Sequence, residues 1–495
     1  MNKVTNTLRA LVTLLAVVLG LSFTGGMTAI AAPSAPGVAA NIQDAGNASG
    51  KFTRDGKPFT RPANHTTPTP SSSFAPQANV VPPAPECPAA LMSHCKFVPA
   101  AYKQDDPNDP TNWGNYDIAS RGLSASSPEI TTIVIHDTEG SCASAISAFQ
   151  DPLYYVSAHY LVCKDGSVIQ LVQNKNIAWH AGNYYTNMHS IGVEHEGNEI
   201  TGAADYTPAE MASSAMLVKW LAAKYNVMLD AQHIIGHQNV SAPLNPYISG
   251  MHVDPGPYWD WEGYFNLLGA PVPPTLPNST HVVTIAPRWS LNKQQLTDNN
   301  GVALPLQSTS TVPLYTQPDF SSPRLTDPVL GQGSNKIDNR AAVAYYGQRF
   351  VYNDYQASLS SVWISIDFDG QKAWFFSPLL VGRNFFFGHE WVATPKAGKT
   401  SVPVYGRAYP AASAYPFSFP SNFIQTVAPL SYTIPAGQRV TVYGEQPADY
   451  YNSQTVDGSG PFDRTTVRDA NSHYVLGTYN GRYVLINAND VDFSI

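Results

Sequence analysis

Charged residues are scarce in this chain: Asp, Glu, Lys and Arg together make up 13% of 495 residues, and the formal net charge is -8. The sequence contains no run of lysines or arginines. A nucleic-acid-binding protein needs a basic face that displaces counterions from phosphates, so this class of protein is excluded. Hydrophobic residues nevertheless reach 43%, which indicates a folded protein rather than a disordered one.

Long apolar segments are missing apart from one near the N-terminus, at residues 10–23, which follows the basic residues Lys3 and Arg9. It is shorter than the roughly 20 residues that span a bilayer, which argues against the alternative of a membrane anchor. No cysteine directly follows it to accept a lipid. We therefore predict a signal peptide over residues 1–31 and a secreted, soluble mature protein.

Cysteine is also rare, with four residues, and no two of them have the C-x-x-C spacing of a zinc-binding pair. In an exported chain an even number of cysteines favours disulfides over free thiols. Three connectivities are possible. We predict the two local pairs, Cys87 with Cys95 and Cys142 with Cys163.

Proline-rich segments divide the chain into parts. Residues 32–98 are dominated by Pro, Ala, Ser, Thr, Asn and Gly and cannot bury enough apolar surface to fold, which predicts a disordered tether. A second proline-rich segment predicts a linker over residues 270–282. Between them, residues 99–269 alternate strand and helix patterns, which predicts an α/β domain whose mixed central sheet is flanked by helices.

After the linker the pattern changes to short strands and turns. Similar peptides begin at Val312 and Val402, and each is followed at the same offset by a Gly-Gln-Arg peptide, at Gly347 and Gly437. This internal repeat predicts two small all-β modules that resemble bacterial SH3-like domains, which usually bind the cell wall in exported hydrolases. The alternative is a pair of modules that merely pack against the preceding domain. The predicted modules are residues 283–390 and 391–495.

Two histidines end short apolar runs: His136 follows residues 133–135, and His237 follows residues 234–236. The end of a buried strand can aim an imidazole rigidly into a cleft. Asp254 adds a carboxylate on a loop rich in Pro and Gly. Two imidazoles and a carboxylate, with a coordination position left for water, suit catalytic Zn²⁺. We therefore predict that these three residues bind zinc.

Five motifs occur here in the order found in the zinc-dependent N-acetylmuramoyl-L-alanine amidase family, which includes phage lysozyme-type amidases and animal peptidoglycan-recognition proteins. The resemblance covers roughly residues 125–265, and five ordered motifs are far more specific than one. The motifs are His136 on a strand, Trp179-His180-Ala181-Gly182, Ser190-Ile191-Gly192-Val193-Glu194, Gly236-His237 and Asp254-Pro255-Gly256-Pro257. The resemblance implies zinc on His136, His237 and Asp254, a catalytic carboxylate at Glu194, and substrate-binding residues at Trp179, His180 and Asn183.

The reaction implied by this resemblance is cleavage of the amide between N-acetylmuramic acid and L-alanine in peptidoglycan. Zinc lowers the pKa of a bound water to about 7. Glu194 would take the proton from that water and pass it to the leaving amine. Glu196 should face the same side of an ideal strand, so spacing alone does not distinguish the two carboxylates. Only the resemblance favours Glu194.

The chain departs from the family near the third ligand. Many members have a lysine two residues before the aspartate, to stabilise the developing oxyanion, and this chain has His252. A histidine can do so as imidazolium, or by donating one N–H while neutral, so we expect activity with an altered pH dependence. Residues 239–251 also form an expanded loop, longer than the family usually has.

Two other functions agree with part of this evidence. A peptidoglycan-recognition protein that binds without cutting would lack a complete ligand set, and Asp254 argues against it. A wall hydrolase of different bond specificity, such as a glycosidase, would need two suitably placed carboxylates and no metal. We expect a monomeric enzyme associated with the cell wall, since a tether and weak wall contacts raise its concentration at the polymer surface.

His233 and His237 are four residues apart, a spacing that would suit a zinc-binding helix. The residues between them have a β-like pattern and lack the glutamate of metalloprotease helices, which argues against that interpretation.

Overall fold

The computed structural model describes residues 83–103, 114–272, 281–339 and 341–495. The predicted signal peptide, most of the predicted tether and most of the linker lie outside these residues. Among the described residues, the helices are all too short or too polar to cross a membrane.

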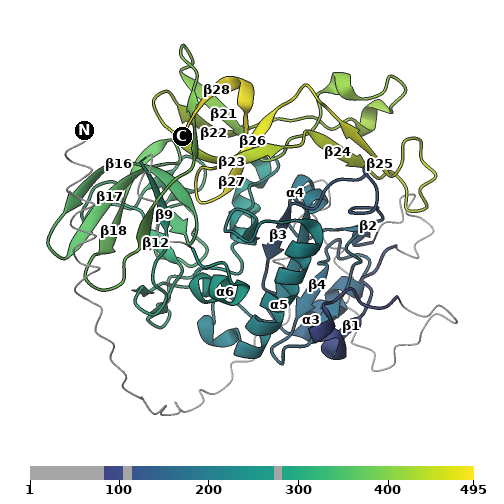
Figure 1. Ribbon diagram of the computed structural model, residues 1–495, viewed down its shortest axis with the longest axis horizontal. Helices are drawn as coiled ribbons and strands as arrows, with labels where there is room; N and C mark the ends of the chain where they lie inside the picture. Colours follow the sequence, from purple (N-terminus) through teal and green to yellow (C-terminus); the bar gives the residue numbers. More distant parts are fainter. Residues whose placement is uncertain (1–82, 104–113, 273–280, 340) are drawn as a thin grey trace.

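The first unit of the fold is built on one six-stranded mixed sheet (Figure 1). Four neighbouring strands are parallel, and a fifth forms an antiparallel hairpin with one of them. This arrangement confirms the predicted mixed sheet. In sheet order the strands are β1 (Cys95–Phe97), β5 (Val168–Gln170), β4 (Tyr160–Val162), β7 (Ser190–His195), β3 (Thr132–Ile135) and β8 (Ile234–Gly236), and a separate pair joins β2 (Tyr116–Asp117) to β6 (Ile177–Ala178).

Helices α5 (Pro208–Tyr225) and α6 (Trp261–Leu268) cover one face of this sheet. α5 begins at a reciprocal cap, in which the Thr207 hydroxyl accepts from the Glu210 N–H and the Glu210 carboxylate accepts from the Thr207 N–H. Alternate residues of β3 and β7 point into this layer and form its core with α5 and α6. These residues are Ile133, Ile135, Ile191 and Val193.

The opposite face is shared by two different elements. At one end α3 (Cys142–Gln150) packs on Leu161 and Ile169. At the other end Val134 and Ile235 are buried against the C-terminal part of the chain. The remaining helix of this unit is α4 (Tyr184–His189), and the 3₁₀ turns are η1 (Ala89–His94), η2 (Ala203–Asp205), η3 (His237–Asn239) and η4 (Asn245–Gly250).

Two antiparallel sheets form the C-terminal part, and residues 281–339 and 341–495 contain no α-helix. The first sheet orders β18 (Gln371–Pro378), β17 (Ser361–Phe368), β16 (Arg349–Ala357), β9 (Val282–Ile285) and β19 (Phe385–Gly388). The second orders β22 (Pro429–Pro435), β21 (Ser401–Tyr405), β27 (Tyr483–Asn487), β26 (Tyr474–Thr478), β23 (Val440–Gln446), β20 (Trp391–Pro395) and β28 (Val491–Ser494). We call the parts that hold them module 1 and module 2.

Smaller elements complete these modules. Module 1 has the pairs β10 (Lys293–Gln294) with β11 (Gln307–Ser308), β12 (Thr311–Pro313) with β15 (Val343–Tyr345), and β13 (Thr326–Asp327) with β14 (Gly331–Gln332). Module 2 has β24 (Asp449–Asn452) with β25 (Thr465–Arg468), and the 3₁₀ turns η5 (Ala412–Ala414), η6 (Ser421–Phe423) and η7 (Ala488–Asp490). The all-β character of both modules is as predicted, and their likeness to SH3 domains stays a prediction.

The predicted tether reaches too far along the chain. η1 and β1 precede residue 98 and belong to the folded unit, where β1 pairs with β5. The Glu86 carboxylate holds this segment down: it accepts from the backbone N–H of Asn174 at 2.9 Å and forms an ion pair with Lys224 at 2.9 Å. Composition does not reveal this boundary, because a few anchoring contacts order a segment that is poor in apolar residues.

Both predicted disulfides are confirmed, Cys87–Cys95 and Cys142–Cys163.

A buried ion pair joins the first unit to module 2. His189 Nε2 lies 2.8 Å from Asp449 Oδ1, and its Nδ1 lies 2.9 Å from the carbonyl of Glu129. Both partners only accept hydrogen bonds, so both ring nitrogens donate and the ring is an imidazolium. Burial by itself lowers the pKa of His189. The charge of Asp449 and the hydrogen bonds from the ring to Asp449 and to the Glu129 carbonyl outweigh this effect and raise the pKa above the ordinary value.

We expect this pair to make stability depend on pH. Because the pKa of His189 is raised in the folded state, the ion pair contributes fully to the free energy of unfolding below the unfolded-state pKa of about 6.5. This contribution is lost as pH rises through the folded-state pKa. His189→Asn should therefore cost about 3 kcal/mol at pH 5.5, because Asp449 is left unpaired, and less at pH 9. Melting temperatures across pH would check this. His473→Asn, which removes an exposed pair with Glu445, is the control, and an equal pH dependence in both variants would contradict the assignment.

Candidate active site

The strand register brings the predicted site together at one edge of the sheet. Ile135 of β3 is opposite Val193 of β7 and opposite Gly236 of β8. The residues that follow these three along the chain, His136, Glu194 and His237, are therefore also neighbours of one another. They lie near the carboxyl ends of the strands, where α/β proteins form ligand-binding crevices. Because side chains alternate along a strand, all three point to the face of the sheet opposite α5.

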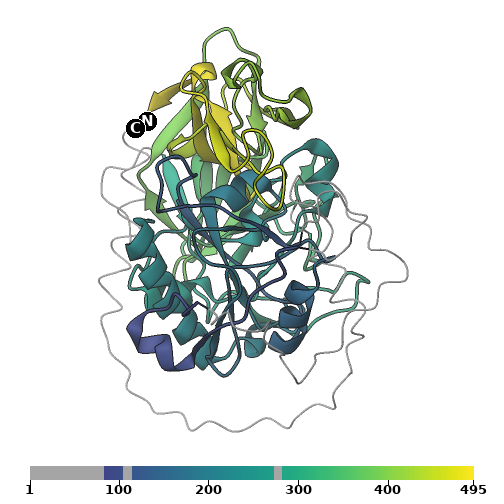
Figure 2. The same cartoon turned by 90° about the vertical axis from the view of Figure 1, so that its right-hand side faces the viewer.

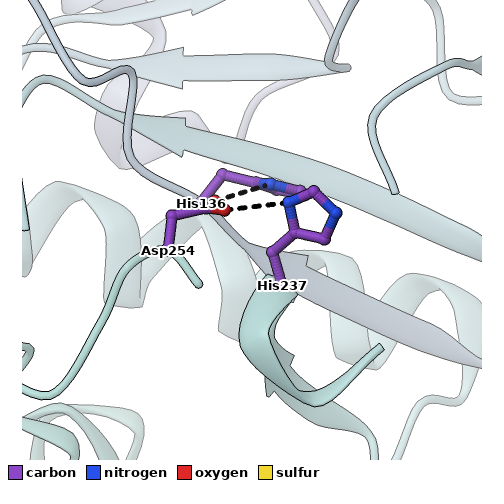
Figure 3. Close-up of side chains that lie close together, drawn as sticks. All are labelled: His136, His237 and Asp254. Carbon is purple, nitrogen blue, oxygen red and sulfur yellow. Dashed lines mark hydrogen bonds and ion pairs between the residues drawn. The ribbon is translucent and has the colours of Figure 1, made fainter. Parts of the chain in front are cut away.

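Asp254 completes the cluster from the loop after the expanded segment (Figure 3). One carboxylate oxygen lies 3.1 Å from His136 Nδ1, and the other lies 3.0 Å from His237 Nδ1. A hydrogen bond of 2.9 Å from the Gln238 N–H to the Asp254 carbonyl fixes the loop beside η3. All three side chains are buried. The structure thus places together the three residues predicted to bind metal.

The chemistry of these atoms fits zinc. The ligand atoms of the three residues lie within 4.8 Å of one another. Asp254 Oδ1 and both ring nitrogens of His237 are buried and have no well-directed hydrogen bond within the described part of the chain. Burial lowers the pKa of His237 and by itself raises that of Asp254, but the neighbouring histidines hold the Asp254 pKa well below its usual value. A neutral imidazole beside an ionised carboxylate is what a cation requires.

His180 orients one of these ligands. Its Nδ1 lies 3.0 Å from His136 Nε2, and its Nε2 lies 3.1 Å from the hydroxyl of Ser190, which donates to the carbonyl of Thr186. Because Ser190 donates its hydrogen to Thr186, His180 Nε2–H donates to Ser190 and His180 Nδ1 accepts from His136 Nε2–H. This bond turns His136 Nδ1 toward Asp254, on the side of the candidate metal site. A Cβ at Gly192 would lie 2.5 Å from the His180 ring, so glycine is needed there.

Trp179 and Asn183, predicted to bind substrate, lie in the interior instead. Trp179 is 4% exposed, and its indole N–H donates to Asp117 at 3.1 Å. Asn183 is 1% exposed and caps α4, and its amide donates to the carbonyls of Ser241 and Gly406 at 3.0 and 2.6 Å. Neither offers a surface to a sugar. Sequence could not show this, because module 2 supplies part of their covering.

The structure distinguishes the two candidate catalytic carboxylates, Glu194 and Glu196, by their surroundings. Glu194 is buried, and its Oε2 has no hydrogen-bond partner within the described residues. Burial raises its pKa well above the usual value, and the charge of Asp254 adds to this. A divalent cation on the three ligands would oppose that rise. Glu196 lies beyond the end of β7, and its carboxylate accepts from the backbone N–H of Lys164 at 3.0 Å. Glu194 is therefore the carboxylate that faces the cluster.

His252 lies at the rim of the same cluster. Its ring stacks on that of His237, with centroids 4.7 Å apart and planes inclined by 19°. Its Nδ1 is 3.5 Å from Asp254 Oδ1, at the long end of hydrogen-bond distances. The side chain is 12% exposed, so it is more accessible than the three ligands. This position is compatible with the predicted contact to a substrate oxygen, which stays a prediction.

Sequence reasoning missed further acidic residues beside the site. The Tyr206 hydroxyl donates to Asp137 Oδ2 at 2.6 Å, and the buried Glu199 Oε2 has no partner within the described residues. Burial, with the charge of Asp254, raises the pKa of Asp137 to about 7. A bound cation would offset this negative charge. Asp137 directly follows His136, which was a usable signal, whereas nothing in the sequence marks Glu199.

The other histidines have structural roles. His159 accepts from the Gly192 N–H at 3.1 Å. His233 lies before β8 and contacts Asp230 at 2.6 Å. Because β8 separates His233 from His237, the two cannot form a helical metal-binding pair.

The comparisons with known proteins agree with this site. Residues 126–257 match the family model described as N-acetylmuramoyl-L-alanine amidase. N-acetylmuramoyl-L-alanine amidase A of Achromobacter lyticus is 34% identical over 177 residues, which are 32% of this chain and 91% of that protein. The 1,6-anhydro-N-acetylmuramyl-L-alanine amidase AmpD of Salmonella typhimurium is 37% identical over 119 residues, 23% of this chain and 57% of that protein.

One solved structure is a complex of the amidase AmiD from E. coli with anhydro-N-acetylmuramic acid-L-Ala-D-gamma-Glu-L-Lys. It is 26% identical, with a TM-score of 0.26, over 30% of this chain and 62% of that one.

The α/β unit and its cluster of two histidines and an aspartate define a hydrolase domain with a candidate metal site. The chain belongs to the N-acetylmuramoyl-L-alanine amidase family. Its relatives support peptidoglycan amidase activity.

Proposed function

We propose that this protein is a secreted, zinc-dependent N-acetylmuramoyl-L-alanine amidase that acts on peptidoglycan. The observation that carries the proposal is the convergence of His136, His237 and Asp254 beside Glu194, on one face of the sheet. Two disulfides support export to an oxidising compartment. The relatives named N-acetylmuramoyl-L-alanine amidase A and 1,6-anhydro-N-acetylmuramyl-L-alanine amidase AmpD support the same class of substrate.

When bound by the three ligands, zinc would supply a Lewis acid for the amide carbonyl and lower the pKa of a water molecule. Glu194 takes a proton from the attacking water and passes it to the nitrogen of the leaving L-alanine. His252 donates an N–H to the oxygen that becomes negative as the carbonyl is attacked. His180 accepts from His136 Nε2 and so holds the His136 ring with Nδ1 toward Asp254 and the metal position, which orients this ligand before substrate binds.

Digestion of purified peptidoglycan would test this proposal. We expect soluble products in the presence of zinc, and their loss when a strong chelator is added and then dialysed away. Returning zinc should restore digestion. Mass analysis should show free lactyl carboxylates on muramic acid paired with new L-alanine N-termini. Cut glycan or cut cross-bridges would identify a different wall hydrolase, and binding without any product would identify a recognition protein.

A further inference from the structure

Module 2 lies on the same face of the sheet as the candidate site. Val134 and Ile235, which point to that face next to His136 and His237, share one buried core with Val404 and Ile486 of module 2. Figures 1 and 2 both show the light-green and yellow strands of module 2 next to the blue and teal α/β unit. Module 2 therefore covers the part of the sheet next to the candidate site, a position that a helix would occupy in an ordinary α/β domain.

The expanded loop between the two last ligands is the main docking element. Its apolar side chains are buried in the same core as module 2. The Asn245 side chain, on η4, accepts from the Ser431 N–H and lies beside the Pro429 carbonyl of β22. The extra residues of this loop thus have a partner within the chain. The buried side chains are Val240, Ala242, Tyr247, Ile248 and Met251.

Arg482 joins the two ends of that loop. It lies in the turn between β26 and β27, and it is 6% exposed. One guanidinium nitrogen donates to the carbonyl of Val240, near the start of the loop. Another donates to the carbonyl of His252, at its end, at 3.1 Å. Because the guanidinium is planar and rigid, it fixes the distance between these two carbonyls.

The turn that presents Arg482 is itself held by both neighbours. The Gly481 carbonyl accepts from the Asn239 side chain at 2.9 Å and from the Gln348 side chain at 2.7 Å. Gly481 has a φ of 75°, a conformation that glycine adopts without strain. The α/β unit, module 1 and module 2 therefore all meet at the residue before Arg482.

We propose that Arg482 is a positioning residue of the active site, and that module 2 completes the catalytic unit instead of acting only as a wall-binding appendage. Arg482 sets the backbone of His252, and Asp254 follows two residues later. Through this backbone it fixes the stacking of His252 on His237 and the approach of the Asp254 carboxylate to both histidines. The inference rests on the proposed zinc amidase function, because it assigns Arg482 to that same site.

A matched arginine allows a direct test. Arg468 also belongs to module 2, and it also donates to two backbone carbonyls of the α/β unit, those of Ala125 and Ser127 at 2.6 and 2.9 Å. That segment carries no site residue. Arg468→Ala therefore removes two hydrogen bonds between the same two parts, at an exposed position, without touching the loop that bears Asp254.

Arg482→Ala and Arg482→Lys should both weaken zinc binding by about 10- to 100-fold, measured by competition with a chromophoric chelator, as loss of an outer-shell partner does. Lysine is included because it can hold only one of the two carbonyls and is less disruptive to folding. On a soluble muramyl peptide, kcat should fall by a similar factor while KM changes less than about threefold. Arg468→Ala should change zinc affinity less than about threefold. Added guanidinium should restore part of the zinc affinity of Arg482→Ala and none to Arg468→Ala.

All measurements belong well below the melting temperature of each variant, in the full-length protein. Zinc affinity that is unchanged in both Arg482 variants, or reduced equally by Arg468→Ala, would overturn the proposal. An inactive wild-type protein would instead count against the amidase function, since zinc affinity is measured without substrate. The two failures are therefore distinguishable.

Discussion

Replacing His237 by alanine should remove both bound zinc and hydrolysis. The substitution deletes one of the three proposed ligands and leaves the Asp254 carboxylate facing His136 and His252. Loss of a metal that contributes several kcal/mol to the transition state corresponds to a fall in kcat/KM of about 10³-fold or more. Zinc content of the purified protein and the rate of release of muramyl-peptide products would check this result.

The control for this experiment is His233→Ala. His233 lies four residues earlier, before β8, and contacts Asp230 outside the cluster. Zinc content and kcat/KM should stay within about twofold of wild type, because no ligand is lost. If His233→Ala lost zinc as well, or if His237→Ala kept it, the assignment of the ligands would be wrong.

Replacing Glu194 by glutamine should lower kcat by about 10²- to 10⁴-fold, the usual contribution of a general base. Zinc should stay bound, since Glu194 is not one of the three converging ligands. Glutamine has nearly the same shape and carries no charge. Because burial already raises the pKa of Glu194, the metal-free variant should melt at or above the temperature of the metal-free wild type.

Glu196→Gln is the matched control, two residues along the chain. Its carboxylate accepts from the backbone of Lys164, so the expected loss is a little stability and less than about threefold in kcat. Steady-state kinetics on a soluble muramyl peptide, with zinc content measured on the same samples, would separate the two residues. A large fall in kcat for Glu196→Gln with a normal Glu194→Gln would reverse their roles.

The sequence predicted the local elements well because short-range chemistry decides them. Thr207 and Glu210 form a reciprocal cap at the start of α5 regardless of distant contacts. The apolar run before His136 forms a buried parallel strand, which needs no polar face. The disulfide between Cys87 and Cys95 closes a short loop, so the local pairing was the reasonable expectation.

Predictions failed where the covering surface comes from far along the chain. Trp179 belongs to a motif that suggests a groove, and Asn183 directly follows this motif. Module 2 nevertheless helps to bury both residues, and Asn183 donates to Gly406. The tether was extended to residue 98 because composition averages over a window and does not detect single anchors such as Glu86. Arg482 carries no local signal at all, since its partners are backbone carbonyls more than two hundred residues earlier.

The sequence by itself determined the ligand types and their order along the chain: two histidines at strand ends and an aspartate on a stiff loop. Residue chemistry and spacing are local properties that a chain carries before it folds. Only the tertiary structure decided which carboxylate faces the candidate metal ligands, that His180 orients His136, and that module 2 holds the loop before Asp254. These depend on strand register and on contacts between distant segments, which no local pattern encodes.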